Sequence, residues 1–147
     1  MLTALLLAGS AASASGQHPE RDTLRSLAIQ ISQLELRRQL ASATPATIDS
    51  LLSLYTDSVV YEHPNAGAVI RGKALMRTGM SQYIGSIRAL HSDTPKVTIG
   101  NGVAIVESTA SMEVESDGKW TSVVRPGIKI IEFDHDHRVK RIIDYPW

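Results

Sequence analysis

Hydrophobic positions in roughly the first 90 residues mostly follow the spacing of α-helices. Apolar residues recur every three or four positions from Leu24 to Leu34, which predicts a helix over Asp22 to Leu40. Thr44 and Pro45 are typical of an N-cap followed by proline in the first turn, so a short second helix is expected. A third helix is expected after Arg71, because an apolar stripe covers three turns through Leu75, Met76, Gly79, Met80, Tyr83, Ile84 and Ile87.

After Pro95 the hydrophobic period changes from 3.6 to 2, which indicates β-strands. Between Gly102 and Glu115 one face of the pattern is apolar and the other is polar, and Asn101-Gly102 is a strong hairpin signal. Trp120 to Phe133 is expected to be one long strand with a bulge at Pro126-Gly127. A final strand is expected from Val139 to Tyr145. Helices followed by an antiparallel meander indicate an α+β fold, with the N-terminal helices packed on one face of the sheet.

One earlier strand, Ser58 to His63, combines an apolar face with an imidazole. Val59, Tyr61 and His63 share a face because side chains alternate along a strand, and Pro64 then ends the pattern. Either His63 is a structural residue that bonds to backbone in the following turn, or it is a titratable group at the mouth of a pocket. Histidine suits the second role, because its ordinary pKa of about 6.5 lets it accept and return a proton near neutrality.

The N-terminal residues differ from the rest of the chain. An apolar run from Leu2 to Ala8 precedes small residues that include the cleavage pattern Ala12-Ser13-Ala14. This run is too short to cross a bilayer, which takes about 20 residues. We therefore expect a signal peptide over residues 1–14, a flexible segment over 15–23 and a single domain over 24–147, in a secreted or periplasmic protein without a stable membrane anchor. The alternative is an apolar first helix packed on the domain.

Composition narrows the function classes further. The 147 residues contain 15 basic and 15 acidic side chains and no cysteine, so the chain has neither a strongly basic surface for nucleic acid nor a thiolate nucleophile. No glycine-rich nucleotide loop is present, and no cofactor is expected. Asp134 to His137 offers metal-binding residue types, but ligands in a turn point away from one another. We expect a solvated turn there and no metal site.

Three short motifs and a closing segment carry a resemblance to a known family. The motifs are Leu54 to Asp57 at the end of a helix, Val60 to Pro64 at the end of a strand, and Arg71 to Lys73 at the start of a helix. The closing segment is FDHDHRVKRI, residues 133–142. Over roughly Leu24 to Tyr145 the chain resembles the SnoaL-like branch of the nuclear transport factor 2-like superfamily. The resemblance implies a strongly curved antiparallel sheet that forms a cone, with the helices closing one side over an apolar pocket, and a homodimer through the outer sheet face.

The same resemblance implies a role for His63. In the ketosteroid isomerases of this superfamily, an aspartate before the corresponding proline moves a proton, so His63 becomes the general-base candidate, with Tyr61 beside it. The other isomerase groups do not carry over. The predicted first helix contains no tyrosine, and the late-strand position near Ile128 or Lys129 holds no acid. True steroid isomerase activity is therefore not expected, because the electrostatic contribution of an oxyanion hole is usually the larger one.

Further candidate ligand-binding residues come from the helix and strands that would surround the cone. They are Tyr61, Tyr83, Trp120, Arg125 and Lys129. We expect one of Arg125 and Lys129 to reach outward to Glu107 or Glu113. The other would enter the cavity and favour an anionic or carbonyl-bearing ligand. The sequence does not decide which of the two faces the pocket.

Two functions remain open from the sequence. The first is an exported protein with a pocket for a small, largely apolar molecule, which catalyses cofactor-independent proton transfer of the isomerase, dehydratase or cyclase type. The alternative is a non-catalytic module that binds a ligand or dimerises. An enzyme needs a second polar group within hydrogen-bonding reach of its base, whereas a binding protein needs only one orienting group.

Overall fold

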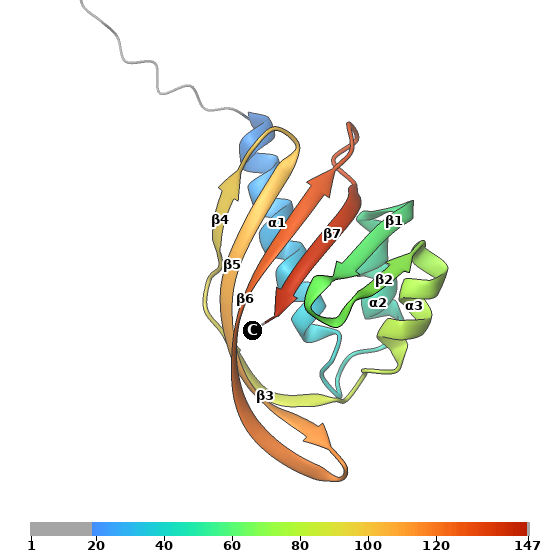
Figure 1. Cartoon of the computed structure of the whole chain (residues 1–147), viewed down its shortest axis with the longest axis vertical. Helices are drawn as coiled ribbons and strands as arrows, with labels where there is room; N and C mark the ends of the chain where they lie inside the picture. The colour runs from blue at the N-terminus through green and yellow to red at the C-terminus, as the bar shows by residue number, and fades with distance from the viewer. Residues whose placement is uncertain (1–18, 147) are drawn as a thin grey trace, which may run out of the picture.

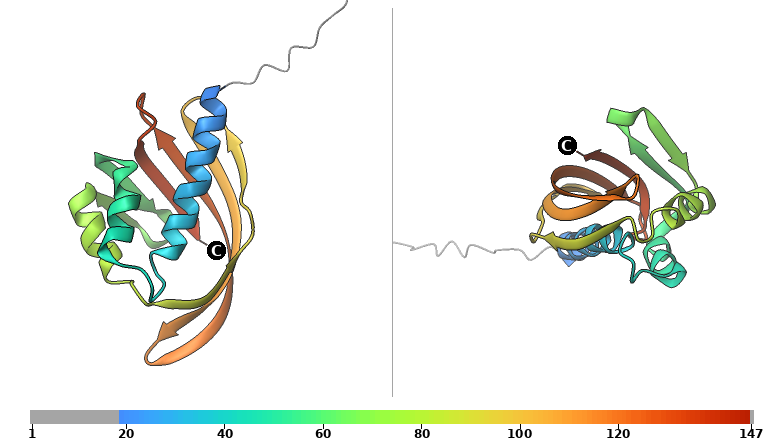
Figure 2. Two further views of the ribbon diagram at one scale, coloured as in Figure 1. Left: turned by 180° about the vertical axis from the view of Figure 1, so that it is seen from behind. Right: turned by 90° about the horizontal axis from the view of Figure 1, so that it is seen from below.

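Three helices and seven strands make up the computed structural model, which describes residues 19–146. The helices are α1 (Pro19–Arg37), α2 (Pro45–Ser53) and α3 (Lys73–Ser81). Helix α1 crosses one face of the sheet, while α2 and α3 lie together at one side of it (Figure 2). The signal peptide expected over residues 1–14 lies outside the described residues.

Two helix ends differ from the sequence prediction. Helix α1 begins at Pro19, so the part of the expected flexible segment that the structure describes is helical. Glu20 and Asp22 stabilise this early start, because acidic side chains in the first turn favour the positive end of the helix dipole. Helix α3 ends at Ser81, and Ile87, the last residue of the predicted stripe, begins a strand instead.

The start of α2 follows the predicted pattern. Thr44 is the N-cap with extended backbone angles, and Pro45 occupies the first turn. The backbone N–H of Thr44 donates a hydrogen bond of 3.1 Å to Oγ1 of Thr47, which satisfies a donor at the helix entrance. This helix leads directly into the first strand, so its end fixes where Tyr55 enters the core.

One mixed sheet holds all of the strands (Figure 1). Its order is β2-β1-β7-β6-β5-β3, with β4 paired to β5 beside this path. The strands are β1 (Tyr55–His63), β2 (Ala68–Arg71), β3 (Ile87–Ser92), β4 (Lys96–Ile99), β5 (Val103–Ser116), β6 (Lys119–Phe133) and β7 (Val139–Pro146). All pairs are antiparallel except β1 with β7, which is parallel. The sheet is therefore mixed where antiparallel pairing was expected, and it is not closed.

The bulge predicted at Pro126-Gly127 is absent. Strand β6 pairs with β5 without a register shift, with Thr109 opposite Pro126. Strand β7 ends opposite Gly127, so Pro126 has a neighbouring strand on one side only and its missing N–H is tolerated. Register shifts occur instead in β1, in β3 around Ala89 and near Phe133. The outer part of the β5–β6 hairpin curves away beyond α1 (Figure 1).

The main core lies between the helices and the inner part of the sheet. Leu24, Ala28 and Ile31 of α1 are buried, as are Ile131 and Ile142 of the central strands. The alternation predicted for β5 is confirmed, because Ala104, Val106, Ala110 and Met112 are buried. Each fully buried Leu or Ile side chain contributes roughly 1.5–3 kcal/mol, so this core positions β6 and β7 firmly against α1. Within residues 19–146, no helix combines the length and apolar character needed to cross a membrane.

Candidate functional site

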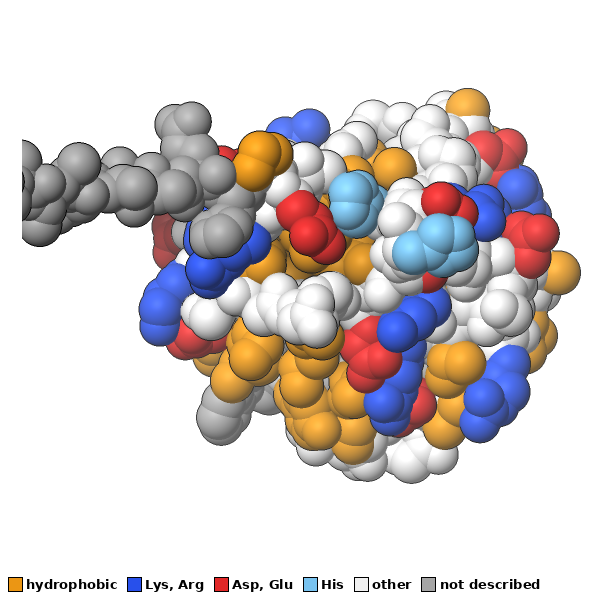
Figure 3. All heavy atoms as spheres, turned by 90° about the horizontal axis from the view of Figure 1, so that it is seen from above, with side chains coloured by type: hydrophobic (Ala, Val, Ile, Leu, Met, Phe, Trp, Pro, Cys, Tyr) orange, Lys and Arg blue, Asp and Glu red, His pale blue; other side chains and the backbone are white. Residues whose placement is uncertain are grey.

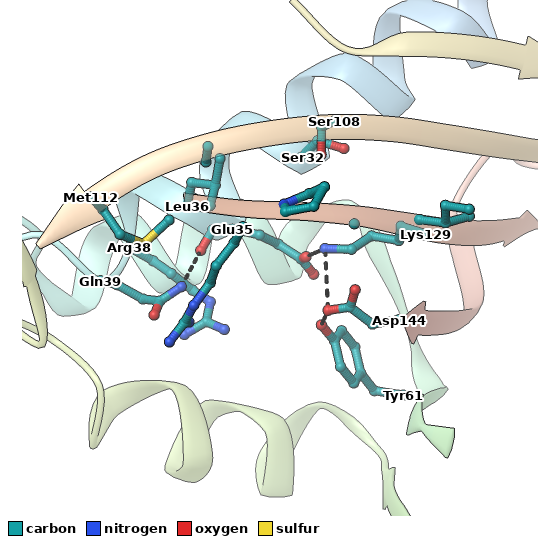
Figure 4. A pocket seen from close by; sticks show the side chains of 15 residues that line it. Ser32, Glu35, Leu36, Arg38, Gln39, Tyr61, Ser108, Met112, Lys129 and Asp144 are labelled. Carbon is teal, nitrogen blue, oxygen red and sulfur yellow. Dashed lines mark hydrogen bonds and ion pairs between the residues drawn. The ribbon is translucent and has the colours of Figure 1, made fainter. Parts of the chain in front are cut away.

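A cavity of about 150 Å³ lies between the C-terminal part of α1 and the strands β5, β6 and β7 (Figure 4). Helix α1 contributes Ser32 and Glu35 to its wall, and Arg38 follows directly after the helix. Strand β1 contributes Tyr61, and the neighbouring β6 and β7 contribute Lys129 and Asp144. The wall therefore combines side chains from five elements, α1, β1, β5, β6 and β7.

Five of the side chains at this place form one chain of polar contacts, here called the polar cluster: Tyr55, Glu35, Lys129, Asp144 and Tyr61. Tyr55 donates a hydrogen bond of 2.9 Å from Oη to Oε1 of Glu35. The Lys129 ammonium donates to Oε2 of Glu35 and lies 3.7 Å from Oδ2 of Asp144. Tyr61 donates from Oη to that same Asp144 oxygen at 2.7 Å. Each carboxylate thus has one tyrosine and the shared lysine as partners.

The hydrophobic pattern of each element places these residues on the face that packs toward the core. Glu35 follows Ala28 and Ile31 at helical spacing, so it lies on the buried stripe of α1. Lys129 and Asp144 are direct partners in the β6–β7 register, which brings their side chains to the same face of the sheet. Tyr61 belongs to β1, the strand on the other side of β7. The helix stripe and the strand alternation together aim all of these groups at one point.

Burial and charge set the protonation states of the polar cluster. Burial raises the pKa of Tyr55, and the neighbouring Glu35 carboxylate raises it further. Burial likewise raises the pKa of Tyr61, with added contributions from the charges of Glu35 and Asp144. For Lys129, burial alone lowers the pKa, but the two carboxylates outweigh this effect and leave the pKa above its ordinary value. At neutral pH the tyrosines are therefore hydrogen-bond donors and the lysine is a cation.

Arg38 stands apart from the polar cluster on the same cavity wall (Figure 4). Its Nε and Nη1 atoms are buried and have no hydrogen-bond partner among residues 19–146. The backbone N–H of Arg38 still bonds to the carbonyl oxygen of Leu34 at 2.9 Å, so the residue continues the helical geometry past the end of α1. Gln39 lies beside it and donates from its side chain to the backbone oxygen of Glu35 at 3.3 Å.

The structure brings three of the sequence-predicted site residues together at the cavity. Tyr61, Arg125 and Lys129 all line it. His63 does not line it. Its ring packs against the ring of Tyr61, with 4.9 Å between the centroids, so it contacts the site through Tyr61. The role of His63 as a general base stays a prediction.

Tyr83 and Trp120, the other two predicted ligand-binding residues, lie away from the cavity. Tyr83 follows α3 and is 56 % exposed. Trp120 lies in the outer part of β6, where the Arg88 guanidinium stacks 4.2 Å from the centre of its ring. Neither residue lines the cavity, because both belong to segments that the main core does not cover.

The expectation that one of Arg125 and Lys129 points outward is wrong. Positions 125 and 129 are an even number of residues apart, so both side chains lie on the same face of β6 and both line the cavity. The carboxylates proposed as outward partners are engaged elsewhere, Glu107 with Lys96 and Glu113 with Arg88. Lys129 is deep, with 16 % of its side chain exposed, whereas Arg125 is an exposed residue on the solvent side of the cavity.

Glu35, Arg38 and Asp144 are site residues that the sequence interpretation missed. Glu35 stands four positions after Ile31 on the apolar stripe, where a charged residue signals a buried partner. Asp144 stands two positions after Ile142, on the inward face of the last strand. The sequence alone could therefore have indicated both residues, because a charged residue at a core position of a regular hydrophobic pattern is unusual. Arg38 carries no such signal, since it lies where the helical pattern ends.

The segment Asp134 to His137 forms an exposed turn between β6 and β7. Oδ1 of Asp134 accepts hydrogen bonds from the backbone N–H groups of Asp136 and Arg138, at 3.0 and 2.8 Å. These bonds lower the pKa of Asp134 and give it a structural role in the turn. Figure 3 looks onto this end of the molecule and shows histidine and acidic side chains at its surface.

Solved structures share this fold at low sequence identity. A protein described as a SnoaL-like polyketide cyclase from Shewanella denitrificans OS-217 superposes with a TM-score of 0.70 and 13 % identity, covering 86 % of this chain and 92 % of that one. An LEH-like epoxide hydrolase from M. tuberculosis superposes with a TM-score of 0.59 and 18 % identity, covering 83 % of this chain and 84 % of that one.

A third structure, described as a ketosteroid isomerase from Kribbella flavida DSM 17836, has a TM-score of 0.61 and 19 % identity, with 87 % and 80 % of the two chains covered. None of the curated proteins matches this chain in sequence. The SnoaL-like domain profile matches residues 36–142, which is most of the chain. The predicted family is confirmed, and the chain belongs to the SnoaL-like domain family with a nuclear transport factor 2-like fold.

Proposed function

We propose that this protein is an enzyme that catalyses cofactor-independent proton transfer on a small molecule carrying a carbonyl group. The observation that carries the proposal is the polar cluster, in which two carboxylates share one lysine at the wall of a ligand-sized cavity. Such clusters of titratable groups in a cavity are typical of acid–base sites. The reaction would be of the isomerase, dehydratase or cyclase type.

Asp144 is the better placed of the two carboxylates to act as the general base. Glu35 uses both of its oxygens, one for Tyr55 and one for Lys129, and only 5 % of its side chain is exposed. Asp144 receives Tyr61 and Lys129 on the same oxygen, Oδ2, and 19 % of its side chain is exposed. Its other oxygen can therefore face a ligand and accept a proton from a carbon next to the carbonyl group.

Lys129 supplies the positive charge that the reaction needs. Removing a proton beside a carbonyl group places negative charge on the carbonyl oxygen. A fixed ammonium in a largely buried site stabilises that charge more strongly than water does. Tyr55 and Tyr61 donate to the carboxylates and so hold them in place for the transfer. The proton that Asp144 accepts then returns to another carbon of the ligand, or leaves with a departing group.

The ligand is expected to be small and partly polar. A cavity of about 150 Å³ has the size of an engineered protein cavity that accepts benzene. Five charged side chains line it: Glu35, Arg38, Arg125, Lys129 and Asp144. Apolar contacts come from Leu36, Ala110, Met112 and Ile128. This mixture fits a carbonyl compound better than a purely apolar molecule.

Deuterium exchange tests the proposal without knowledge of the natural substrate. Cyclohexanone in D₂O loses the ¹H NMR signals of the hydrogens beside its carbonyl group when a base removes them. We expect the wild-type protein to accelerate this loss above the buffer rate, and Asp144→Asn to reduce the acceleration at least about 100-fold. Asp136→Asn is the matched control, because Asp136 is a carboxylate of the exposed β6–β7 turn.

A second result would overturn catalysis and favour the binding module. In that case cyclohexanone would perturb the amide signals of residues around the cavity, while the exchange rate would equal that of buffer. Failure of both readouts would remove the cavity itself as a ligand site.

Export and dimerisation are separate proposals. The apolar run and Ala12-Ser13-Ala14 support cleavage after Ala14, and mass spectrometry of the full chain expressed in a Gram-negative host should find a periplasmic product that begins at Ser15. An uncleaved cytoplasmic product would contradict export.

For the homodimer through the outer sheet face, Thr109→Arg should convert a dimer into a monomer in sedimentation experiments. A wild-type monomer would contradict it.

A further inference from the structure

Arg38 places a positive charge at the cavity wall without an ion-pair partner among the described residues. Two of its guanidinium nitrogens, Nε and Nη1, are buried and lack a hydrogen-bond partner among the described residues. An enclosed cation without a paired anion is costly, because burial removes the water that would otherwise solvate it. Proteins normally place an acidic side chain beside such a group. No carboxylate in residues 19–146 forms an ion pair with Arg38.

The nearest acid along the helix is already engaged. Glu35 stands three positions before Arg38 and therefore on the same side of the helix, a spacing at which side chains can pair. Both oxygens of Glu35 are occupied instead, by Tyr55 and by Lys129. Asp144 is likewise held by Tyr61 and lies near Lys129. The polar cluster thus satisfies itself and leaves Arg38 without a partner.

Charges around the cavity leave one positive charge in excess. The lining contains two carboxylates, Glu35 and Asp144, and three cations, Lys129, Arg38 and Arg125, while its other side chains are neutral. A ligand with one negative charge would balance this wall. Arg125 is exposed and Arg38 is partly buried, and both of these cations line the cavity outside the polar cluster.

We propose that Arg38, assisted by Arg125, binds the carboxylate of the ligand, and that the substrates are therefore small oxo acids. The inference rests on the proposed function, because it places the ligand's carbonyl group at the polar cluster and its carboxylate at Arg38. A guanidinium matches a carboxylate with two parallel hydrogen bonds, which an ammonium cannot do. Residues three positions apart on a helix have Cβ atoms roughly 5–6 Å apart, so Arg38 starts close to Glu35 and the polar cluster, which suits a small ligand.

A doubly charged anion fits less well. It would exceed the single positive charge in excess, and it would bring further negative charge close to Glu35 and Asp144. A cavity of about 150 Å³ also has little room for a phosphorylated sugar. We therefore expect inorganic phosphate to compete weakly.

Calorimetric titration with a matched pair of probes tests the inference. The probes are 4-oxopentanoate and 4-oxopentanamide, which have nearly the same shape and differ by one charge. We expect wild-type protein to bind the carboxylate at least about 10-fold more tightly than the amide, as for a charge-assisted hydrogen-bonded pair. Arg38→Met should abolish this preference while leaving amide binding within about twofold.

Arg37→Met is the control, because Arg37 is the neighbouring basic residue of α1 and does not line this cavity. It should keep the full preference for the carboxylate. If Arg38→Met does not fold, Arg38→Lys supplies the second variant, and it should bind the carboxylate more weakly than wild type because the planar fork is lost.

Equal binding of the two probes by wild-type protein would overturn the inference, as would an unchanged preference in Arg38→Met. The proposed function would survive either result if cyclohexanone still exchanged its hydrogens. If the carboxylate preference held but no exchange occurred with any ketone, the anion site would stand and catalysis would fail.

Discussion

The two halves of β6 belong to one regular strand but have opposite environments. The inner half, from Gly127 to Phe133, has β5 on one side and β7 on the other, and it carries Lys129. The outer half, from Lys119 to Val124, pairs with β5 alone and carries Trp120 and an exposed Val124. Helix α1 covers the first half and not the second (Figure 1). The inner half is covered by β5, β7 and α1 and therefore forms part of the cavity site. The outer half lacks β7 and α1 and forms part of the protein surface.

Electrostatics sharpens the contrast between these halves. In the inner half, the buried charge of Lys129 is essential for stability, because it is the cation that compensates two carboxylates, Glu35 and Asp144. In the outer half, charged and aromatic side chains contact each other in solvent, as Arg88 does with Trp120. The same kind of substitution should therefore change stability more in the inner half of β6 than in the outer half.

The largest effect is expected from Lys129→Met. This change leaves Glu35 and Asp144 close together without their shared cation, so the free energy of unfolding should fall by about 3–5 kcal/mol. Urea denaturation measures the change. Lys119→Met in the exposed outer half is the matched control and should alter stability little. Equal effects of the two substitutions would contradict the contrast between the halves.

Loss of the proposed base comes next. Asp144→Asn keeps an acceptor oxygen for Tyr61 but cannot take a proton, so exchange should fall at least about 100-fold, equivalent to about 2.7 kcal/mol in the barrier. Its thermal unfolding midpoint should change much less than that of Lys129→Met. A variant with full exchange activity would exclude Asp144 as the base.

Tyr61 links the site to pH. Its pKa is raised by burial and by the charges of Glu35 and Asp144, so the folded protein holds this proton when an ordinary tyrosine, with a pKa of about 10, releases it. Stability from this group is complete below about pH 10 and is lost as the pH rises through the higher folded value. Tyr61→Phe should weaken the alkaline loss, and it should cost about 1.5 kcal/mol near pH 8. Denaturation curves from pH 8 to 11 would show an unchanged slope if this assignment is wrong.

The smallest effect is expected in the outer half of β6. Trp120→Ala removes the stacking with Arg88, which is worth about 0.5–1 kcal/mol at exposed sites, and it should leave exchange activity unchanged. Unfolding curves and the cyclohexanone assay check both parts. A large loss of activity would mean that the outer half belongs to the site after all.

The sequence predicted the fold better than the site, for physical reasons visible in single residues. Regular periods identified α2, the β4–β5 hairpin and the buried face of β5, because hydrophobic burial imposes those periods directly. Strand β3 was missed, since it is short and largely exposed and begins within a stripe that looks helical. The parallel β1–β7 pair was missed because a local pattern does not say which distant strand becomes a neighbour.

For the site, the sequence indicated which residues of an element face inward, but it did not indicate which distant residues they would contact. Tyr61 and Lys129 were identified as candidates, and both line the cavity. Pairing between Glu35 and Lys129 spans 94 positions, so only the packing of α1 on β6 reveals it. His63 drew attention through its place beside Pro64, yet the acid that accepts the hydrogen bond of Tyr61 is Asp144, near the end of the chain.

The cyclohexanone exchange rates of wild type, Asp144→Asn and His63→Ala, measured under the same conditions, decide which residue is the base. We expect a loss of at least about 100-fold for Asp144→Asn. We expect a loss below about 10-fold for His63→Ala, because His63 packs against Tyr61 and does not line the cavity. The reverse order, with His63→Ala inactive and Asp144→Asn near wild type, would contradict the role of Asp144 and make His63 the base.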